Sequence, residues 1–179
     1  MINKRDTPTR CKFLLSQWKE NLNLTNYERT KFEDILNQLD FQINKLEKKE
    51  LQISVYGRVG VGKSSLLNAL IKKQVFPTDI LNGNTKTNKS HKWCKKFQSL
   101  NKVELIDSPG IDEINNSNKE EINFNHVLKT DLILFVIDSD ITQVELKSLE
   151  GLLRNNKPIL LILNRCDQWS RREVKLILS

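Results

Sequence analysis

Short apolar runs alternate along the chain with segments whose apolar residues recur every three or four positions. Residues 51–56 alternate apolar and polar side chains, as a half-buried strand does, whereas 132–137 are apolar throughout, as in a strand buried on both faces. Runs of these kinds predict strands at 51–56, 91–97, 102–106, 131–137 and 158–163. Helical spacing predicts helices at 64–71, 120–128, 143–154 and 171–178. Strands and helices in this order predict a three-layer α/β fold with a mostly parallel sheet.

Residues 1–48 precede this pattern and are predicted to be helical, with a first helix over 8–20. Thr25 and Glu28 have the spacing of a capping box. Apolar residues then recur at helical spacing as far as Leu46, which predicts one amphipathic helix of about six turns over 26–48. Its apolar stripe is expected to dock on the rest of the chain, with a partner helix or a membrane surface as the alternative. We therefore expect a helical extension at 1–48 and an α/β domain at 49–179.

Composition limits the class of protein. The 179 residues suffice for one domain with a short appendage, and 29 basic against 22 acidic residues leave a formal charge of +7. This balance can favour nucleic acid or an anionic membrane. A lysine-rich surface around an anionic ligand is preferred, because no run of five or six basic residues stands apart from the predicted fold. Cys11, Cys94 and Cys166 form no C-x-x-C pair and indicate free thiols in a reducing compartment. Without an apolar run of bilayer length or a secretory signal, we expect a soluble cytoplasmic protein.

The strongest chemical signal lies between the first strand and the next helix. Residues 57–64 read Gly-Arg-Val-Gly-Val-Gly-Lys-Ser and fit the phosphate-loop pattern G-x-x-x-x-G-K-[ST]. Gly57, Gly60 and Gly62 let backbone N–H groups turn toward phosphate oxygens, Lys63 adds a positive charge, and Ser64 offers a hydroxyl to Mg²⁺. A glycine-rich turn that binds nothing is the simpler reading. Because a strand and a helix flank the loop, a nucleoside triphosphate site is favoured.

Two further segments follow predicted strands. Asp107-Ser108-Pro109-Gly110 comes after the strand at 102–106, and Asn164-Arg165-Cys166-Asp167 after the strand at 158–163. Ligands of open α/β sheets bind at these strand ends. We expect Asp107 to hold Mg²⁺, directly or through water, and the Gly110 N–H to face the γ-phosphate.

These motifs, in this order, resemble those of the Ras-like GTPases, and most of all the Era and EngA-like branch. Residues 61–70, which include Val61 and Ser65, read VGKSSLLNAL, a sequence typical of that branch. Residues 82–86 resemble the sequence of its switch I loop. More weakly, the N-terminal helices resemble those of a cyanobacterial group of Era-like GTPases. The resemblance implies that Thr85, with Thr87 as the rival, closes on Mg²⁺ and the γ-phosphate. It also implies that Asn164 and Asp167 select guanine.

The sequence departs from this family in several places. Ile111 stands where Ras-type enzymes have the Gln that orients water, Gly60 where potassium-activated members have Asn, and Arg165 where Lys is usual. The last base-contacting loop, the sixth strand and the final helix have no counterpart after Asp167. We therefore expect an unpaired apolar edge near 159–163, and either a longer parent protein or a partner that completes the domain.

The expected function is a switch that binds GTP or GDP with Mg²⁺ and hydrolyses GTP slowly. Lys63 and Thr85 are the expected catalytic residues, and Ser64, Thr85 and Asp107 the expected metal ligands. The alternative is a degenerate module that holds nucleotide weakly or not at all and acts through its N-terminal helix. RNA or the ribosome, a membrane surface, and a homodimer or activating partner all stay open as partners, whereas Asn164 and Asp167 disfavour an ATPase or kinase.

Overall fold

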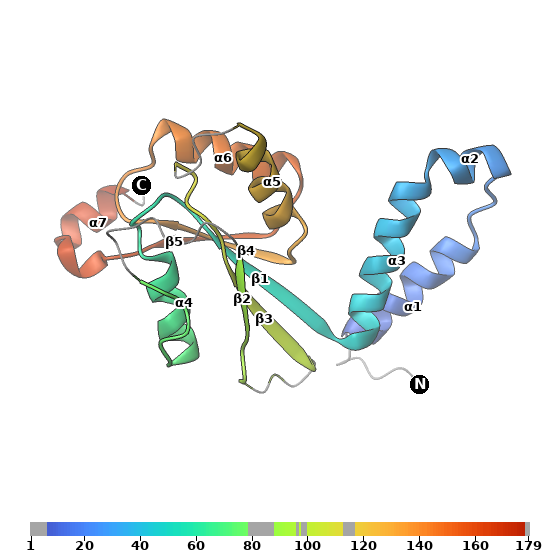
Figure 1. Ribbon diagram of the computed structural model, residues 1–179, viewed down its shortest axis with the longest axis horizontal. Helices are drawn as coiled ribbons and strands as arrows, with labels where there is room; N and C mark the ends of the chain where they lie inside the picture. The colour runs from blue at the N-terminus through green and yellow to red at the C-terminus, as the bar shows by residue number, and fades with distance from the viewer. Residues whose placement is uncertain (1–6, 79–87, 96, 98–99, 113–116, 178–179) are drawn as a thin grey trace. The chain divides into compact units, whose positions relative to one another are not determined.

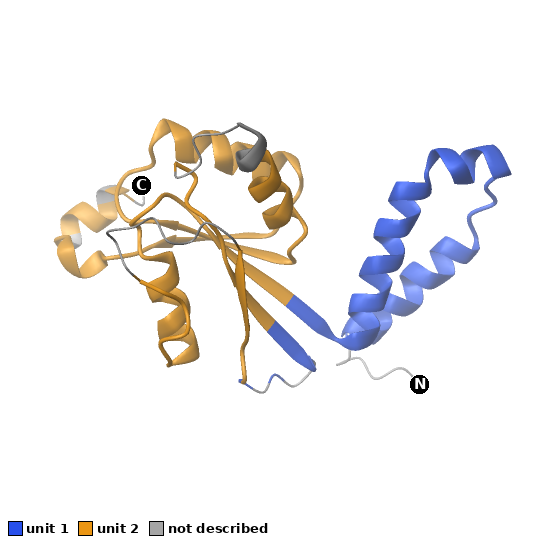
Figure 2. Cartoon of the chain, viewed as in Figure 1, with its two compact units in different colours: residues 1–51, 95–103 blue, residues 52–94, 104–179 orange. Residues whose placement is uncertain are grey.

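The computed structural model describes residues 7–78, 88–95, 97, 100–112 and 117–177. The chain divides into two compact units (Figure 2). Unit 1 comprises residues 1–51 and 95–103, and unit 2 comprises residues 52–94 and 104–179. Unit 1 thus includes a segment from the middle of the chain as well as the N-terminal residues. The expected domain boundary after residue 48 remains a prediction.

Unit 1 contains three helices: α1 (Thr7–Glu20), α2 (Asn26–Lys31) and α3 (Glu33–Lys48). α1 packs along α3, where Lys12 forms an ion pair with Glu47 at 2.7 Å and Lys19 forms one with Asp40 (Figure 1). Several apolar side chains of α1 stay exposed, since Phe13, Leu14 and Trp18 are 47%, 54% and 56% exposed. Charged pairs therefore contribute to this helix contact.

The capping box before α2 is confirmed, but the single long helix after it is wrong. The Thr25 hydroxyl accepts from the Glu28 N–H, and the Glu28 carboxylate accepts from the Thr25 N–H at 2.9 Å. At Phe32 the backbone leaves the helical region, with φ −105° and ψ 16°. Glu33 and Asp34 then supply negative charge to the first turn of α3, which favours a new helix start there. Apolar spacing does not reveal such a one-residue break.

Unit 2 contains most of a five-stranded sheet with the strand order β2-β3-β1-β4-β5, while the first residues of β1 and β3 belong to unit 1. β1 (Glu50–Tyr56), β4 (Leu132–Ile137) and β5 (Ile159–Leu163) run parallel, and β2 (Lys89–Lys92) pairs antiparallel with β3 (Lys102–Asp107). Figure 1 shows α5 (Ser117–Leu128) and α6 (Gln143–Arg154) on one side of the sheet and α4 (Lys63–Ile71) on the other. A 3-10 helix (Cys166–Gln168) and α7 (Arg171–Ile177) follow β5. The expected three-layer, mostly parallel fold is confirmed.

β2 is shorter than expected and differently placed. The predicted strand over 91–97 is wrong, since the pairing with β3 ends at Lys92 opposite Glu104. Phe97 forms only an isolated bridge with Leu100. Alternation in the sequence does not set a strand's length, because the hydrogen bonds to its neighbour do so.

The core of unit 2 lies along β4, where Ile133, Phe135 and Ile137 are buried with Leu152 of α6. An apolar run such as that of β5 predicts a buried strand, and for β5 this prediction is wrong. Leu160 and Leu161 are 54% and 43% exposed. In the described part of the chain β5 pairs with β4 alone, which agrees with the apolar edge expected there. Among the described residues, no helix combines the length and apolarity needed to span a bilayer.

Candidate functional site

The glycine loop turns sharply between β1 and α4. Gly57, Gly60 and Gly62 have φ values of 151°, 81° and 91°, which residues with a side chain rarely adopt. Gly57 also has no room for one, because a Cβ there would lie 2.3 Å from the carbonyl oxygen of Val136. The loop thus passes close against the end of β4.

Lys63 is the first residue of α4 and is only 8% exposed. Its Nζ donates to the carbonyl oxygens of Gly57 at 2.9 Å and Arg58 at 2.6 Å. The ammonium group therefore lies over the loop. The N-cap of α4 is Gly62, which has no side chain to cap the helix, and the first turn of α4 follows directly on the loop. An ammonium group and a helix N-terminus at one loop suit an anionic ligand.

Ser64 and Asp107 join the loop to the end of β3. The Ser64 hydroxyl donates to the Asp107 carboxylate at 2.6 Å, and Asp107 is completely buried. A hydroxyl and a carboxylate are the hard oxygen ligands that Mg²⁺ takes together with waters and phosphate oxygens. The pair fits a Mg²⁺ site, and in the described part of the chain no cluster of three or more His, Cys, Asp or Glu offers another metal site.

The segment after Asp107 packs directly on the glycine loop. A Cβ at Gly110 would lie 2.8 Å from the Val59 nitrogen, and the Ile111 N–H donates to the Gly57 carbonyl at 3.2 Å. The Val59 N–H in turn donates to the Asp112 carboxylate at 2.7 Å. Ile111 is 8% exposed and belongs to the core cluster. Its side chain thus points away from solvent, and Asp112 is a loop contact that the sequence did not indicate.

The Asn164–Asp167 segment reaches the opposite end of the glycine loop. Asn164 donates through Nδ2 to the Val61 carbonyl at 2.8 Å, and its own N–H bonds to Ile137 at the end of β4. Arg165 donates to the Gly60 carbonyl at 2.6 Å. Asp167 lies in the 3-10 helix with its side chain exposed. The segment therefore contacts the glycine loop through Asn164 and Arg165.

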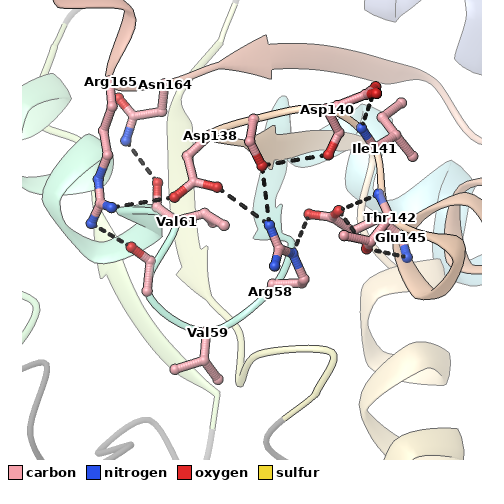
Figure 3. A network of polar contacts seen from close by, with 12 residues as sticks. Arg58, Val59, Val61, Asp138, Asp140, Ile141, Thr142, Glu145, Asn164 and Arg165 are labelled. Carbon is pink, nitrogen blue, oxygen red and sulfur yellow. Dashed lines mark hydrogen bonds and ion pairs between the residues drawn. The ribbon is translucent and has the colours of Figure 1, made fainter. Parts of the chain in front are cut away.

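A chain of charges connects these elements (Figure 3). Arg58 pairs with Glu145 at 2.9 Å and with Asp138 at 3.4 Å, and Asp138 pairs with Arg165 at 3.2 Å. The hydrogen bond to buried Glu145 is the main cause that raises the pKa of Arg58, so this guanidinium stays charged. Trp169 donates through Nε1 to the Asp138 carbonyl at 3.2 Å.

Sequence reasoning missed this chain of charges, although two signals pointed to it. Asp138 directly follows an apolar strand, as Asp107 follows β3. Thr142 and Glu145 have capping-box spacing, and the box is formed in the structure.

The structure brings together most of the predicted site. Lys63, Ser64, Asp107, Gly110 and Asn164 all contact the glycine loop or each other. Val61 is buried within the loop, and Ser65 is exposed in the first turn of α4. Thr85 and its rival Thr87 lie outside the described residues. The three cysteines are free and exposed, as expected.

Solved structures share this fold. The chain superposes on Era from Aquifex aeolicus with a TM-score of 0.63 and 24% identity, covering 73% of this chain and 46% of that one. A second structure is Era in complex with MgGDPNP and part of 16S ribosomal RNA, with a TM-score of 0.61 and 24% identity over 73% of this chain and 45% of that one.

Sequence comparison reaches the level of family. GTPase Der of Bartonella bacilliformis is 32% identical over 131 residues, which are 70% of this chain and 27% of Der. The probable GTP-binding protein EngB of Mycoplasmopsis agalactiae is 32% identical over 133 residues, which are 69% of this chain and 65% of EngB. The chain thus spans about a quarter of Der. The model of the 50S ribosome-binding GTPases matches residues 52–165. The chain therefore belongs to this family, as a P-loop GTPase of the TrmE–Era–EngA type.

Proposed function

We propose that this protein is a guanine-nucleotide switch that binds GTP and GDP with Mg²⁺ and hydrolyses GTP slowly. The observation that carries the proposal is the contact between Ser64 and Asp107 at 2.6 Å beside the buried Lys63. Family membership supports a GTPase at the coarser level.

Each part of the site has a proposed task. Lys63 and the loop amides of residues 57–65 bind the β- and γ-phosphates, where their positive charge stabilises the charge that develops during transfer. Ser64, Asp107 and Thr85 hold Mg²⁺, which when bound neutralises charge on the same phosphate oxygens. The hydrogen bond from Asn164 to Val61 supports a role for Asn164 in holding the base loop, residues 164–169, against the glycine loop. Asp167 accepts from guanine N1–H and the 2-amino group, a pair that adenine does not offer.

The buried position of Ile111 supports slow turnover. A side chain packed into the core has no polar group to orient the attacking water. In this proposal an activating partner, a second copy of the chain or a displaced residue supplies that group. In this proposal the γ-phosphate orders the segments at about 76–90 and 108–120, and hydrolysis releases them. The second segment senses the γ-phosphate through the contacts of Ile111 and Asp112 with the glycine loop.

A nucleotide titration tests the proposal. Fluorescent GDP, GTP and ATP analogues are added to the purified chain with and without Mg²⁺, and xanthine nucleotides are added to Asp167→Asn. We expect guanine specificity in the natural chain and a change to xanthine in the variant, since the amide reverses one hydrogen bond to the base. Asp40→Asn in unit 1 is the matched control and keeps guanine specificity. A folded protein that binds no nucleotide would overturn the proposal.

The same buried Ile111 favours a second candidate, a nucleotide-binding module without hydrolysis. Single-turnover assays with GTP separate the two, because the module releases GTP unchanged whereas the slow enzyme produces GDP. For the downstream partner we propose RNA in the cytoplasm, supported by the Era complex with ribosomal RNA. Salt-sensitive retardation of RNA supports this partner, and co-sedimentation with anionic liposomes contradicts it.

A further inference from the structure

Asp138 lies at the end of β4, between the two loops of the candidate site (Figure 3). Its Oδ1 contacts Nη2 of Arg58 in the glycine loop at 3.4 Å, and its Oδ2 contacts Nη1 of Arg165 in the base loop at 3.2 Å. The side chain is only 19% exposed. One carboxylate therefore lies between two cations that come from loops far apart in the sequence.

Each arginine is also held by a second acceptor. Arg58 pairs through Nε with Oε1 of Glu145, which is completely buried, and Glu145 is itself held by the Thr142 N–H and hydroxyl. Arg165 donates through Nη2 to the Gly60 carbonyl at 2.6 Å. The forked guanidinium of Arg165 presents one nitrogen to Asp138 and another to Gly60, whereas a lysine would have to reach both acceptors from a single nitrogen.

The backbone of Asp138 adds a third connection, since its carbonyl accepts from Trp169 Nε1 at 3.2 Å. Asp138 thus contacts three residues. Its side chain contacts Arg58 in the glycine loop and Arg165 in the base loop, and its carbonyl contacts Trp169 at the end of the base loop. Two arginines face two carboxylates, so the charges balance within the cluster. Without Asp138 the two guanidinium groups would repel each other across the gap between the loops.

We infer that Asp138 is a positioning residue that holds the glycine loop and the Asn164–Trp169 segment in one fixed arrangement. The inference rests on the proposed function, in which a nucleotide contacts the glycine loop through its phosphates and the Asn164–Trp169 segment through its base. The distance between phosphates and base then sets how far apart the two loops must lie. A protein that holds both loops in place before binding loses less freedom when the nucleotide binds. Removal of Asp138 should therefore weaken nucleotide binding without removing any group that touches the nucleotide.

Amide hydrogen exchange on the full chain without nucleotide is the first test. Asp138→Asn keeps the shape of the side chain and removes its charge. We expect faster exchange in residues 57–62 and also in residues 164–169. Glu150→Gln is the matched control, because Glu150 pairs with Arg154 at 3.6 Å on the exposed face of α6, and it should leave both segments unchanged. Faster exchange confined to residues near 138 would overturn the inference.

The release rate of fluorescent GDP is the second test. We expect Asp138→Asn and Arg165→Lys each to speed release by about tenfold, and the double variant to release GDP within about twofold of the faster single variant. Such non-additivity follows if both changes remove the same contact. Effects that multiply to about a hundredfold would show two independent roles and contradict the inference.

Thermal unfolding of each variant identifies changes that only disturb the fold. If Asp138→Asn does not fold, hydrogen exchange in Arg165→Lys tests the inference instead, since this variant keeps the charge and has a single nitrogen in place of the fork. A natural chain that binds no guanine nucleotide, with exchange rising in both segments of Asp138→Asn, would refute the proposed function and keep the positioning role. Normal binding with unchanged exchange and release would refute the positioning role and keep the proposed function.

Discussion

The Ser64 hydroxyl donates a 2.6 Å hydrogen bond to the Asp107 carboxylate, although 43 positions separate the two residues along the chain. Ser64 stands in the first turn of α4 and Asp107 at the end of β3. β3 and β1 are neighbours in the sheet, and the glycine loop carries the chain from β1 into α4. Sheet order thus brings together the two oxygen ligands that we assign to Mg²⁺.

Ser64→Ala should abolish most of the gain in nucleotide affinity that Mg²⁺ provides. The variant loses one oxygen ligand, and we expect Mg²⁺ to bind at least about tenfold more weakly. GDP titrations in Mg²⁺ and in EDTA measure this. Ser64→Thr keeps the hydroxyl and should keep the metal dependence. An alanine variant with the natural Mg²⁺ response would show that the metal lies elsewhere.

The three loop glycines should differ in their tolerance of alanine. Gly60→Ala should cost about 1–2 kcal/mol of unfolding free energy, because its φ of 81° is strained for alanine but a Cβ would meet nothing within 4 Å. Gly57→Ala should cost about 3–5 kcal/mol, since its Cβ would also collide with the Val136 carbonyl oxygen. Urea denaturation of both variants measures the difference. Equal losses would mean that backbone strain alone decides the cost.

Ile111→Gln should not restore fast hydrolysis, despite matching the residue of Ras-type enzymes. The side chain lies among Tyr56, Phe135 and Leu152, so an amide there would be buried and destabilise the protein by about 2–4 kcal/mol. Ile111→Val is the packing control and should cost about 0.5–1.5 kcal/mol. Single-turnover GTP hydrolysis and urea denaturation measure the two effects. A large rise in rate for the glutamine variant would mean that this segment leaves the core when GTP binds.

Acid should weaken the contact between α1 and α3. The hydrogen bond from Lys12 is the main cause that holds the pKa of Glu47 below its ordinary value of 4.5. A carboxyl group whose pKa is lowered by folding stabilises the folded state above its unfolded pKa, and this stabilisation disappears as the pH falls through the lower folded pKa. An NMR titration should therefore give Glu47 a pKa below 4.5 in the natural chain, and one nearer 4.5 in Lys12→Gln. Since the pair is exposed, the difference should shrink in high salt; a pKa unaffected by Lys12→Gln would contradict this assignment.

Much of the candidate site followed from sequence because its chemistry is local. A phosphate loop needs glycines, a lysine and a serine within eight consecutive positions, and its neighbouring strand and helix show in the spacing of apolar residues. Asp107 was found because it follows a strand, and ligands of open α/β sheets bind at these strand ends. The expected role of Asn164 came from the resemblance to the Ras-like GTPases. The capping box at Thr25 was equally predictable, since both of its hydrogen bonds lie within four residues.

The short β2 and the exposed Leu160 depended on the tertiary structure, because a strand's length and burial are set by what pairs with it and covers it. The burial of Ile111 and the position of Asp138 between Arg58 and Arg165 likewise depend on segments far apart in the chain. The sequence by itself determined which residue types make up the candidate phosphate and base site, since these lie in continuous motifs. Only the tertiary structure decided which charges hold those motifs in place, because an ion pair forms between whichever side chains the packing brings together.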